Sequence, residues 1–200
     1  MARRRNDAAY EQARTNLLEV GLALIRTRGF ESTGLNDILK SAGLPKGSFY
    51  HYFANKEAFG IAVAEAYHQQ QLAFASQTLR DNTQPPGTRL HRFFSTALQD
   101  FEQRQFKEGC LMCNLSTELG DTADVFRAAL ARHWDELAQE LATCLLPEVR
   151  QALHLAHLTD KEAADTLING WSGALTRMKV ERSAAPLQLF IRSMFRDLPA

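Results

Sequence analysis

The sequence lacks long hydrophobic runs. No apolar stretch approaches the ~20 residues of a membrane-spanning helix, and the basic first residues are not followed by the apolar segment of a secretory signal peptide. We therefore expect a soluble protein of the cytoplasm. Cysteine is also scarce, with three residues in a chain of 200. An odd number of thiols in a reducing compartment argues against a framework of structural disulfides.

The chain also lacks a net charge, because 23 basic residues balance 23 acidic ones. The balance is uneven, since residues 1–56 carry a net charge of +4 and the remainder a net charge of −4. A basic end suggests an anionic partner, although a surplus of four charges is a weak signal by itself. Three of those basic residues, Arg3, Arg4 and Arg5, would either reach a phosphate or groove or remain disordered.

No segment alternates polar and apolar residues for long enough to form a β-strand. Apolar residues instead recur at helical spacing along almost the whole chain, which predicts an all-α fold of about nine helices. The expected helix boundaries carry residues that typically begin or end helices: Gly29 and Gly43 at C-termini, Thr33, Asn55 and Thr159 with Glu162 at N-termini, and Pro45 and Pro186 in first turns.

The segment "SAGLPKG", residues 41–47, joins two short expected helices through a tight turn. This arrangement is typical of a helix-turn-helix unit, whose second helix lies in the major groove of DNA. The second helix, "PKGSFYHYF", carries hydroxyl, imidazole and ammonium groups with no acid, a composition suited to phosphate oxygens and base edges. The amides that follow Asn55, together with Lys56, form an expected phosphate site.

Residues 17–59 resemble the DNA-binding domain of the TetR family of bacterial transcriptional regulators. The resemblance rests on "GF" after the first helix, on "AGLPKGSFYHYF" and on the following "KE". By position, it implies a set of DNA contacts made by Lys46, Gly47, Ser48, Tyr50, His51 and Lys56. Phe49, Tyr52 and Phe53 are expected to hold the recognition helix on the domain. Packing is also the alternative role for Tyr50 and His51.

The resemblance also implies an architecture: a DNA-binding domain over residues 1–56 and an effector-binding and dimerisation domain over residues 57–200. A homodimer paired through its last two helices would then bind a palindromic DNA operator. Two apolar stripes, within residues 163–178 and 187–195, are more hydrophobic than one-sided packing requires, which favours a dimer over a monomer. The candidate linings of the effector pocket are aromatic residues that equally suit the core: Phe59, Tyr67, Phe74, Phe93, Phe94, Phe101, Trp134 and Trp171.

The segment "GCLMCNLS", residues 109–116, holds two cysteines, Cys110 and Cys113. Cys144 and His133 are not spaced to complete a metal site with them, so we expect no metal and no cofactor. A disulfide would require the first turn of a helix, and simple burial is the plainest alternative. The expected start of a helix just after Cys110 would lower the pKa of its thiol and favour a reactive thiolate.

The pattern "GCL", "LS-E" and, later, "W-GA" and a lysine resembles the effector domain of NemR-type repressors, the TetR-family proteins that respond to electrophiles and oxidants. That resemblance implies that Cys110 is the sensing residue. Regulators of acrylate metabolism have a similar layout, so a small unsaturated acid is an alternative effector. Cys113 departs from the subgroup and would be a resolving partner or have no role. Lys179 would pair with a Cys110 thiolate or extend to solvent.

The leading hypothesis is a repressor that leaves its operator when Cys110 is modified or when an effector binds near it. The runner-up is reversible binding of a non-reactive ligand, with Cys110 only lining the pocket. An enzyme using Cys110 as nucleophile, with His133 or His154 as base, is disfavoured because no orienting carboxylate or oxyanion hole is evident. An adaptor without DNA binding is also disfavoured.

Overall fold

The computed structural model describes residues 7–121 and 124–198, so Arg3, Arg4 and Arg5 lie outside the described residues. Within those ranges it contains helices and no β-strand, which confirms the all-α prediction. The elements are nine α-helices and one 3-10 helix: α1 (Asp7–Arg28), α2 (Leu35–Ser41), η1 (Phe49–His51), α3 (Lys56–Leu79), α4 (Pro86–Gln103), α5 (Leu111–Leu119), α6 (Asp124–Ala142), α7 (Pro147–Ala152), α8 (Asp160–Glu181) and α9 (Ala185–Met194).

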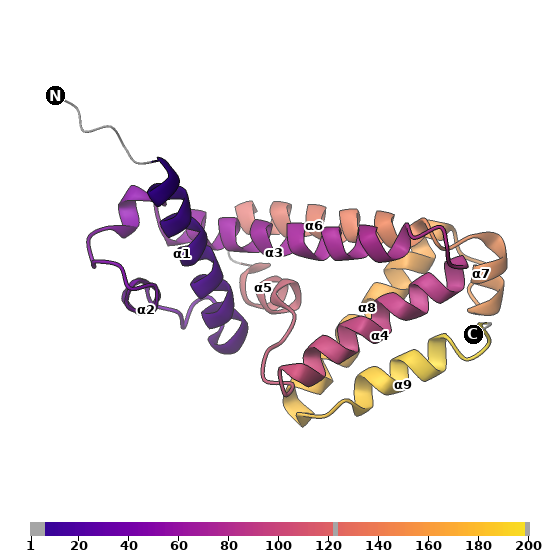
Figure 1. The fold of residues 1–200 in the computed structure, drawn as a ribbon. Coiled ribbons are helices and arrows are strands. Elements are labelled where there is room, and N and C mark those ends of the chain that lie inside the picture. The colour runs from indigo at the N-terminus through magenta and orange to yellow at the C-terminus, as the bar shows by residue number, and fades with distance from the viewer. Residues whose placement is uncertain (1–6, 122–123, 199–200) are drawn as a thin grey trace.

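Two long helices, α3 and α6, run side by side along the molecule and connect its two ends (Figure 1). The long helix α1 and the short elements α2 and η1 form one end, and α4, α7, α8 and α9 gather at the other (Figure 1). The short helix α5 lies between them and contacts α1, α3 and α6. None of the described helices is both long enough and apolar enough to cross a membrane.

The buried side chains form two hydrophobic cores. The first core combines α1, α2, η1 and the first half of α3 with α5 and the start of α6, and its largest fully buried members include Phe49, Phe59 and Phe126. The second core combines the rest of α3 with α4, α7, α8, α9 and the rest of α6. Helix α5 therefore packs in the core of the N-terminal end although its sequence lies far beyond residue 56. The expected domain boundary at residue 56 stays a prediction.

Close packing of α1 on α3 depends on a glycine. A Cβ atom added at Gly21 would overlap the ring of Phe59, and it would lie 3.1 Å from a methyl carbon of Val63. Phe59 and Val63 are fully buried. The absence of a side chain at residue 21 thus sets how closely the first helix approaches the third.

Most of the expected helix boundaries are confirmed. Gly29 and Gly43 both have positive φ angles, 89° and 68°, after α1 and α2. The side chain of Asn55 accepts a hydrogen bond of 2.7 Å from the amide of Ala58 and begins α3. Thr159 and Glu162 form the expected capping box of α8.

The predicted cap at Thr33 is wrong. Gly34 occupies the N-cap position of α2 and no side chain caps that helix. The Thr33 hydroxyl instead donates a 2.6 Å hydrogen bond to the carbonyl of Gly29, and the residue is fully buried. A threonine hydroxyl can bond a nearby backbone carbonyl in place of a helix amide, and here the tight turn after α1 provides the carbonyl.

The α-helix expected over residues 45–53 is also wrong. Residues 45–48 form a turn, and only the single 3-10 turn η1 follows. The amides of Ser48 and His51 bond the carbonyls three residues before them, at 3.0 Å each. Gly47 disfavours a helix, and the Ser48 hydroxyl donates a second hydrogen bond of 2.8 Å to the carbonyl of Pro45.

The apolar stripes of α8 and α9 are largely buried within the chain itself. Trp171, Met178, Leu187 and Phe190 all belong to the second core. Their hydrophobicity therefore does not require a second copy of the chain. The prediction of a homodimer therefore rests on the family architecture and not on these stripes.

Candidate DNA-binding face and effector site

The predicted DNA-contacting residues lie at the end of the molecule formed by α1, α2 and η1. Lys46, Gly47 and His51 are exposed, and Tyr50 has 68% of its surface accessible to solvent. The neighbouring ring of Phe49 is buried and contacts Tyr50 edge to face, with 5.6 Å between ring centroids. One aromatic residue thus anchors η1 while the next points outward.

The residues expected to pack do so. Phe53 is buried with Phe49 in the first core, and Tyr52 is half-buried and stacks on Tyr10 with 5.0 Å between centroids.

Lys56 differs from the other predicted DNA contacts because its ammonium already has partners within the chain. Its ammonium donates a 3.1 Å hydrogen bond to the carbonyl of Glu31 and lies 4.6 Å from the ring centroid of Phe30. Its role at DNA stays a prediction.

Cys110 occupies the N-cap position of α5 and is half-buried. The pKa of its thiol is lowered to about 6, chiefly because the Cys113 thiol donates a hydrogen bond to its sulfur. Burial opposes this shift, while backbone amides of α5 and the hydroxyl of Tyr67, 3.7 Å from Sγ, also lower the pKa. The pKa of the Cys113 thiol is raised because its proton is shared with Cys110. Cys110 is therefore the member of the pair that ionises.

Sequence reasoning missed Arg26, a buried cation beside this thiol. Its Nε donates a 3.0 Å hydrogen bond to the carbonyl of Gly109, and its guanidinium forms a 3.0 Å ion pair with Glu108. The same guanidinium lies 5.7 Å from the centroid of the Tyr67 ring. A single arginine beside an apolar helical stripe gives no sign of such partners, because Gly109 is 83 residues away in the chain.

Lys179 lies on α8 at the edge of a surface cleft of about 400 Å³ that Cys110, Cys113 and Glu118 also line. The Lys179 ammonium donates a hydrogen bond to the side-chain oxygen of Asn114 at 3.5 Å. The structure thus brings Lys179 to the same cleft as Cys110, and the hydrogen bond that it forms there is to an amide rather than to the thiol.

Cys110 also borders an interior cavity of about 60 Å³. Most of its lining is apolar, and it includes six of the eight predicted aromatic residues: Tyr67, Phe93, Phe94, Phe101, Trp134 and Trp171. Trp171 is buried and packs edge to face on Phe94 at 5.2 Å. Phe59 lies in the first core and Phe74 lines a separate pocket, so these two do not border the cavity. Cys110 thus stands between an open cleft and an apolar interior.

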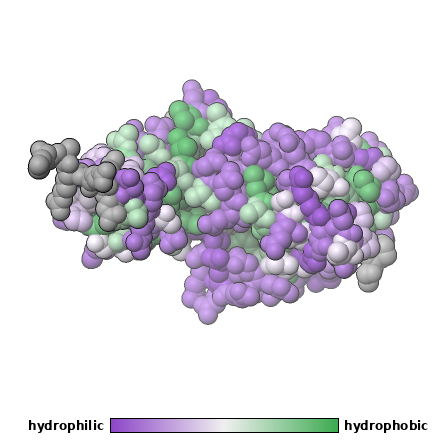
Figure 2. Space-filling model, turned by 45° about the horizontal axis from the view of Figure 1, so that its top comes forward, coloured by the Kyte–Doolittle hydropathy of each residue, from purple (hydrophilic) through white to green (hydrophobic). Residues whose placement is uncertain are grey.

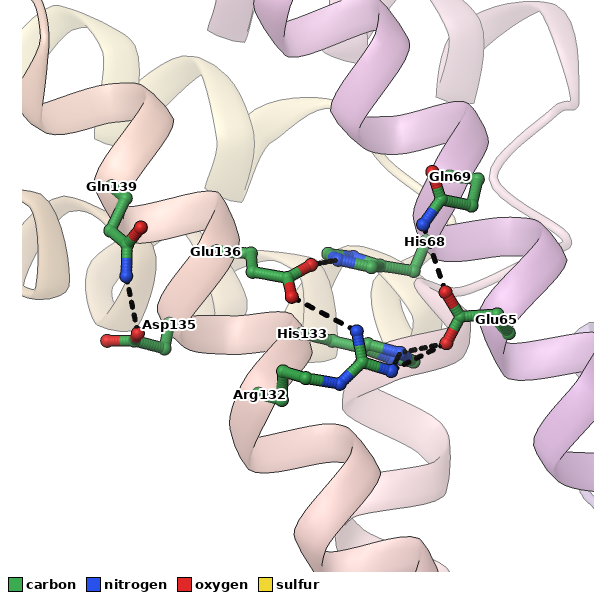
Figure 3. A network of polar contacts seen from close by, with 8 residues as sticks. All are labelled: Glu65, His68, Gln69, Arg132, His133, Asp135, Glu136 and Gln139. Carbon is green, nitrogen blue, oxygen red and sulfur yellow. Dashed lines mark hydrogen bonds and ion pairs between the residues drawn. The ribbon is translucent and has the colours of Figure 1, made fainter.

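The histidines considered as catalytic bases have other partners. His133 forms a 3.0 Å hydrogen bond with Glu65 and stacks on His68 across the interface of α3 and α6 (Figure 3). His154 is exposed and pairs with Asp197 at 2.9 Å. In residues 7–121 and 124–198 no three or more histidine, cysteine, aspartate or glutamate side chains gather as a metal site would require.

Comparison with known proteins decides the family. Residues 17–63 match the family described as bacterial regulatory proteins, tetR family, and residues 86–194 match the tetracyclin repressor-like C-terminal domain. The chain belongs to the TetR family. It is a DNA-binding transcriptional regulator, and the relatives below are named as regulators rather than enzymes.

The similarity extends over nearly the whole chain. The transcriptional regulator AcuR of Cereibacter sphaeroides is 37% identical over 92% of this TetR-family chain and 84% of its own length. The repressor NemR of Escherichia coli is 33% identical over 92% of both chains. The crystal structure of reduced NemR covers 92% of this chain and 95% of its own, with a TM-score of 0.80 and 29% identity. A regulatory protein TetR from Rhodobacter sphaeroides covers 92% and 98%, with a TM-score of 0.85 and 34% identity. The resemblance to a NemR-like effector domain is confirmed.

Proposed function

We propose that this TetR-family regulator is a cytoplasmic repressor that binds a palindromic operator as a homodimer and leaves it when Cys110 is modified. Two of the relatives are named as repressors, DhaR of Mycobacterium sp. strain GP1, at 34% identity, and NemR. The proposed DNA contacts are those predicted above: Lys46, Gly47, Ser48, Tyr50, His51 and Lys56. Lys46, Gly47 and His51 are exposed at that end of the molecule, and much of the whole surface drawn in Figure 2 is hydrophilic.

One observation carries the sensing role. Cys110 lies at the N-cap of α5 on the wall of a cleft, and hydrogen bonds from the Cys113 thiol and from amides of α5 lower the pKa of its own thiol, which favours the thiolate, the nucleophilic form. The cleft of about 400 Å³ gives small molecules a path to this sulfur. The thiolate would add to the β-carbon of a conjugated alkene while the α-carbon takes a proton from water. With a hydroperoxide it would form sulfenic acid and release an alcohol.

The second cysteine, Cys113, would support the ionised form of Cys110. Its thiol donates a hydrogen bond that stabilises the Cys110 thiolate. After oxidation of Cys110 to sulfenic acid, the Cys113 sulfur is adjacent on the first turn of α5 and could condense with it. Mass spectrometry after hydroperoxide treatment would distinguish a Cys110–Cys113 disulfide from a sulfenic acid that persists.

The test is operator binding measured by fluorescence anisotropy on DNA from the region upstream of the protein's own gene, before and after treatment with N-ethylmaleimide. We expect the treated wild type to bind at least ten times more weakly and Cys110→Ser to be unaffected by treatment. Cys144→Ser is the matched control, because Cys144 is buried and should leave the response unchanged. An equal response of wild type and Cys110→Ser would contradict the sensing role.

A second candidate function is release by reversible binding of a non-reactive ligand. The apolar cavity beside Trp171 and Cys110 favours it, because such cavities bind small apolar molecules. Its volume of about 60 Å³ admits only a very small ligand unless side chains move. Release of the wild type and of Cys110→Ser by the same saturated compound would support this function over covalent sensing.

A further inference from the structure

Glu118 joins α5 to the DNA-binding end of the molecule. Its carboxylate accepts hydrogen bonds from two successive backbone amides, those of Phe30 at 2.8 Å and Glu31 at 2.7 Å. These amides belong to the turn that links α1 to α2, and they lie 88 and 87 residues from Glu118 in the chain. A carboxylate that accepts two amide hydrogen bonds makes a charge-assisted contact, which is stronger than a neutral one.

The turn is shaped to receive this carboxylate. Gly29 has a φ of 89°, a conformation that aims successive amides into one concave site for an anion. A Cβ atom at residue 29 would lie 3.1 Å from each carboxylate oxygen of Glu118, so the close approach also requires glycine. Two features of one residue, its backbone conformation and its lack of a side chain, thus serve the same contact.

The same turn holds the start of α3. The carbonyl of Glu31 accepts the hydrogen bond from Lys56, the first residue of α3, and Phe30 lies under the Lys56 ammonium. The ring of Phe30 also packs edge to face on Phe126 of α6, with 5.3 Å between centroids. Movement of Glu118 would therefore reach the segment that leads from η1 into α3.

The other end of α5 carries Cys110. Here the carbonyl of Gly109 accepts the hydrogen bond from Arg26, and the Asn114 amide donates to the Arg26 carbonyl at 3.4 Å. The start of α5 is thus attached to α1, and its end to the turn after α1. Glu118 is eight positions after Cys110, a helical rise of about 12 Å at 1.5 Å per residue.

A group added to the Cys110 sulfur has two places to go. The interior cavity holds only about 60 Å³, so a larger adduct that enters it must move the side chains that line it or shift Cys110 and the start of α5. The outer cleft is lined by Gly29 and Glu118 as well as by Cys110, so an adduct there occupies the same cleft as that contact. In either place, the adduct would disturb the hydrogen bonds that Glu118 accepts from Phe30 and Glu31.

We propose that Glu118 is the positioning residue through which a change at Cys110 reaches the DNA-binding end. This inference rests on the proposed function, because it assigns the residue that couples the sensor to the operator. In the unmodified protein the Glu118 carboxylate holds the α1–α2 turn and the start of α3 in the operator-binding arrangement. Modification of Cys110 weakens this contact and with it the affinity for the operator.

The first measurement is hydrogen exchange at the amides of Phe30 and Glu31, followed by NMR in the full-length protein. These amides should exchange slowly in the unmodified wild type and at least ten times faster after Cys110 is alkylated with N-ethylmaleimide. In Glu118→Ala they should exchange fast before and after alkylation. Unchanged exchange of both amides after alkylation of the wild type would overturn the inference, whatever happens at the operator.

The second measurement is the ratio of operator affinities before and after alkylation. Glu118→Ala should still be alkylated at Cys110, but its ratio should be at least tenfold smaller than that of the wild type. Glu118→Gln, which keeps one acceptor oxygen, should be intermediate, and it serves if the alanine variant does not fold. Glu102→Ala, at an exposed carboxylate of α4, is the control.

If alkylation weakens operator binding by the same factor in the wild type and in both Glu118 variants, the inference fails while the proposed function stands. If alkylation does not change the operator affinity of the wild type, the proposed function fails. The exchange rates of the Phe30 and Glu31 amides then show by themselves whether a change at Cys110 reaches the Glu118 contact.

Discussion

The imidazole rings of His68 and His133 stack with their centroids 4.0 Å apart and their planes at 16° (Figure 3). Each ring pairs through Nε2 with a carboxylate of the facing helix, His68 with Glu136 at 2.6 Å and His133 with Glu65 at 3.0 Å. Arg132 binds both carboxylates. A carboxylate only accepts, so a hydrogen bond to Glu136 or Glu65 requires the proton of each ring on Nε2.

This arrangement favours a neutral His133. Its Nδ1 is buried and has no hydrogen-bond partner among the described residues, so a second proton there would be unpaired. Burial is the main cause that lowers the pKa of His133, and repulsion from His68 acts in the same direction, while Glu65 opposes the shift. The stack therefore joins α3 to α6 most strongly when His133 is uncharged.

Acidification should weaken the fold through His133. An unfolded histidine has a pKa near 6.5, so below that pH the unfolded chain binds a proton that the folded chain resists. As the pH falls below about 6.5, the free energy of unfolding should decrease by up to about 1.4 kcal/mol per pH unit for this proton. Urea unfolding at pH 7.5 and pH 5.5 measures the effect. His133→Gln keeps a donor to Glu65 without titrating, so its dependence on pH should be shallower.

The control for this experiment is His154→Gln, because His154 is exposed on the surface.

The paired carboxylates affect stability in a different pH range. The pKa of Glu65 is lowered to about 2, chiefly by a hydrogen bond from Gln69, so its contribution is lost only as the pH falls well below 4.5. Equal slopes between pH 7.5 and pH 5.5 for wild type and His133→Gln would contradict the prediction.

Alkylation of Cys110 by iodoacetamide should accelerate with pH around pH 6 and level off above about pH 7, because the thiolate is the reactive form. Cys113→Ala should move the midpoint to higher pH, since the hydrogen bond from Cys113 is the largest cause of the lowered pKa. Tyr67→Phe should move it less. Mass spectrometry of the modified peptide gives the rates, with buried Cys144 as internal control. A midpoint near pH 9 in the wild type would refute this account.

Lys46 should contribute an ionic contact to DNA, because its side chain is exposed beside η1. Lys46→Ala should weaken operator binding and reduce the slope of log affinity against log salt by about one for each half-site. Anisotropy titrations at several salt concentrations measure the slope. Lys107→Ala is the matched control, because this exposed lysine pairs with Gln105 beyond the end of α4. A slope unchanged by Lys46→Ala would remove Lys46 from the contact set.

Gly21→Ala should destabilise the fold by about 1–3 kcal/mol, because the added methyl group overlaps the buried ring of Phe59. Gly47→Ala is the comparison, since a Cβ there meets no atom within 4 Å, and it should change stability by less than about 0.5 kcal/mol. Denaturant unfolding measures both variants. Equal stabilities would mean that α1 can move away from α3 without cost.

Local signals in the sequence predicted most of the helices. The side chain of Asn55 and the pair Thr159 and Glu162 begin helices through contacts with residues only three positions away, and such contacts depend little on the rest of the fold. The predictions failed where two local options compete. Thr33 and Ser48 both bond backbone carbonyls in turns, and no sequence pattern distinguishes that choice from a helix cap or a helical turn.

The sequence by itself determined the all-α fold, the TetR-type DNA-binding segment and the position of Cys110 at the start of a helix, because helical periodicity, caps and short motifs are local. Only the tertiary structure decided what surrounds that thiol. Arg26 reaches Gly109, and Glu118 reaches the turn after α1, across more than 80 residues of chain. These contacts exist because α5 packs in the core of the DNA-binding end, and that packing depends on the combined shape of four helices, which no single segment of the sequence specifies.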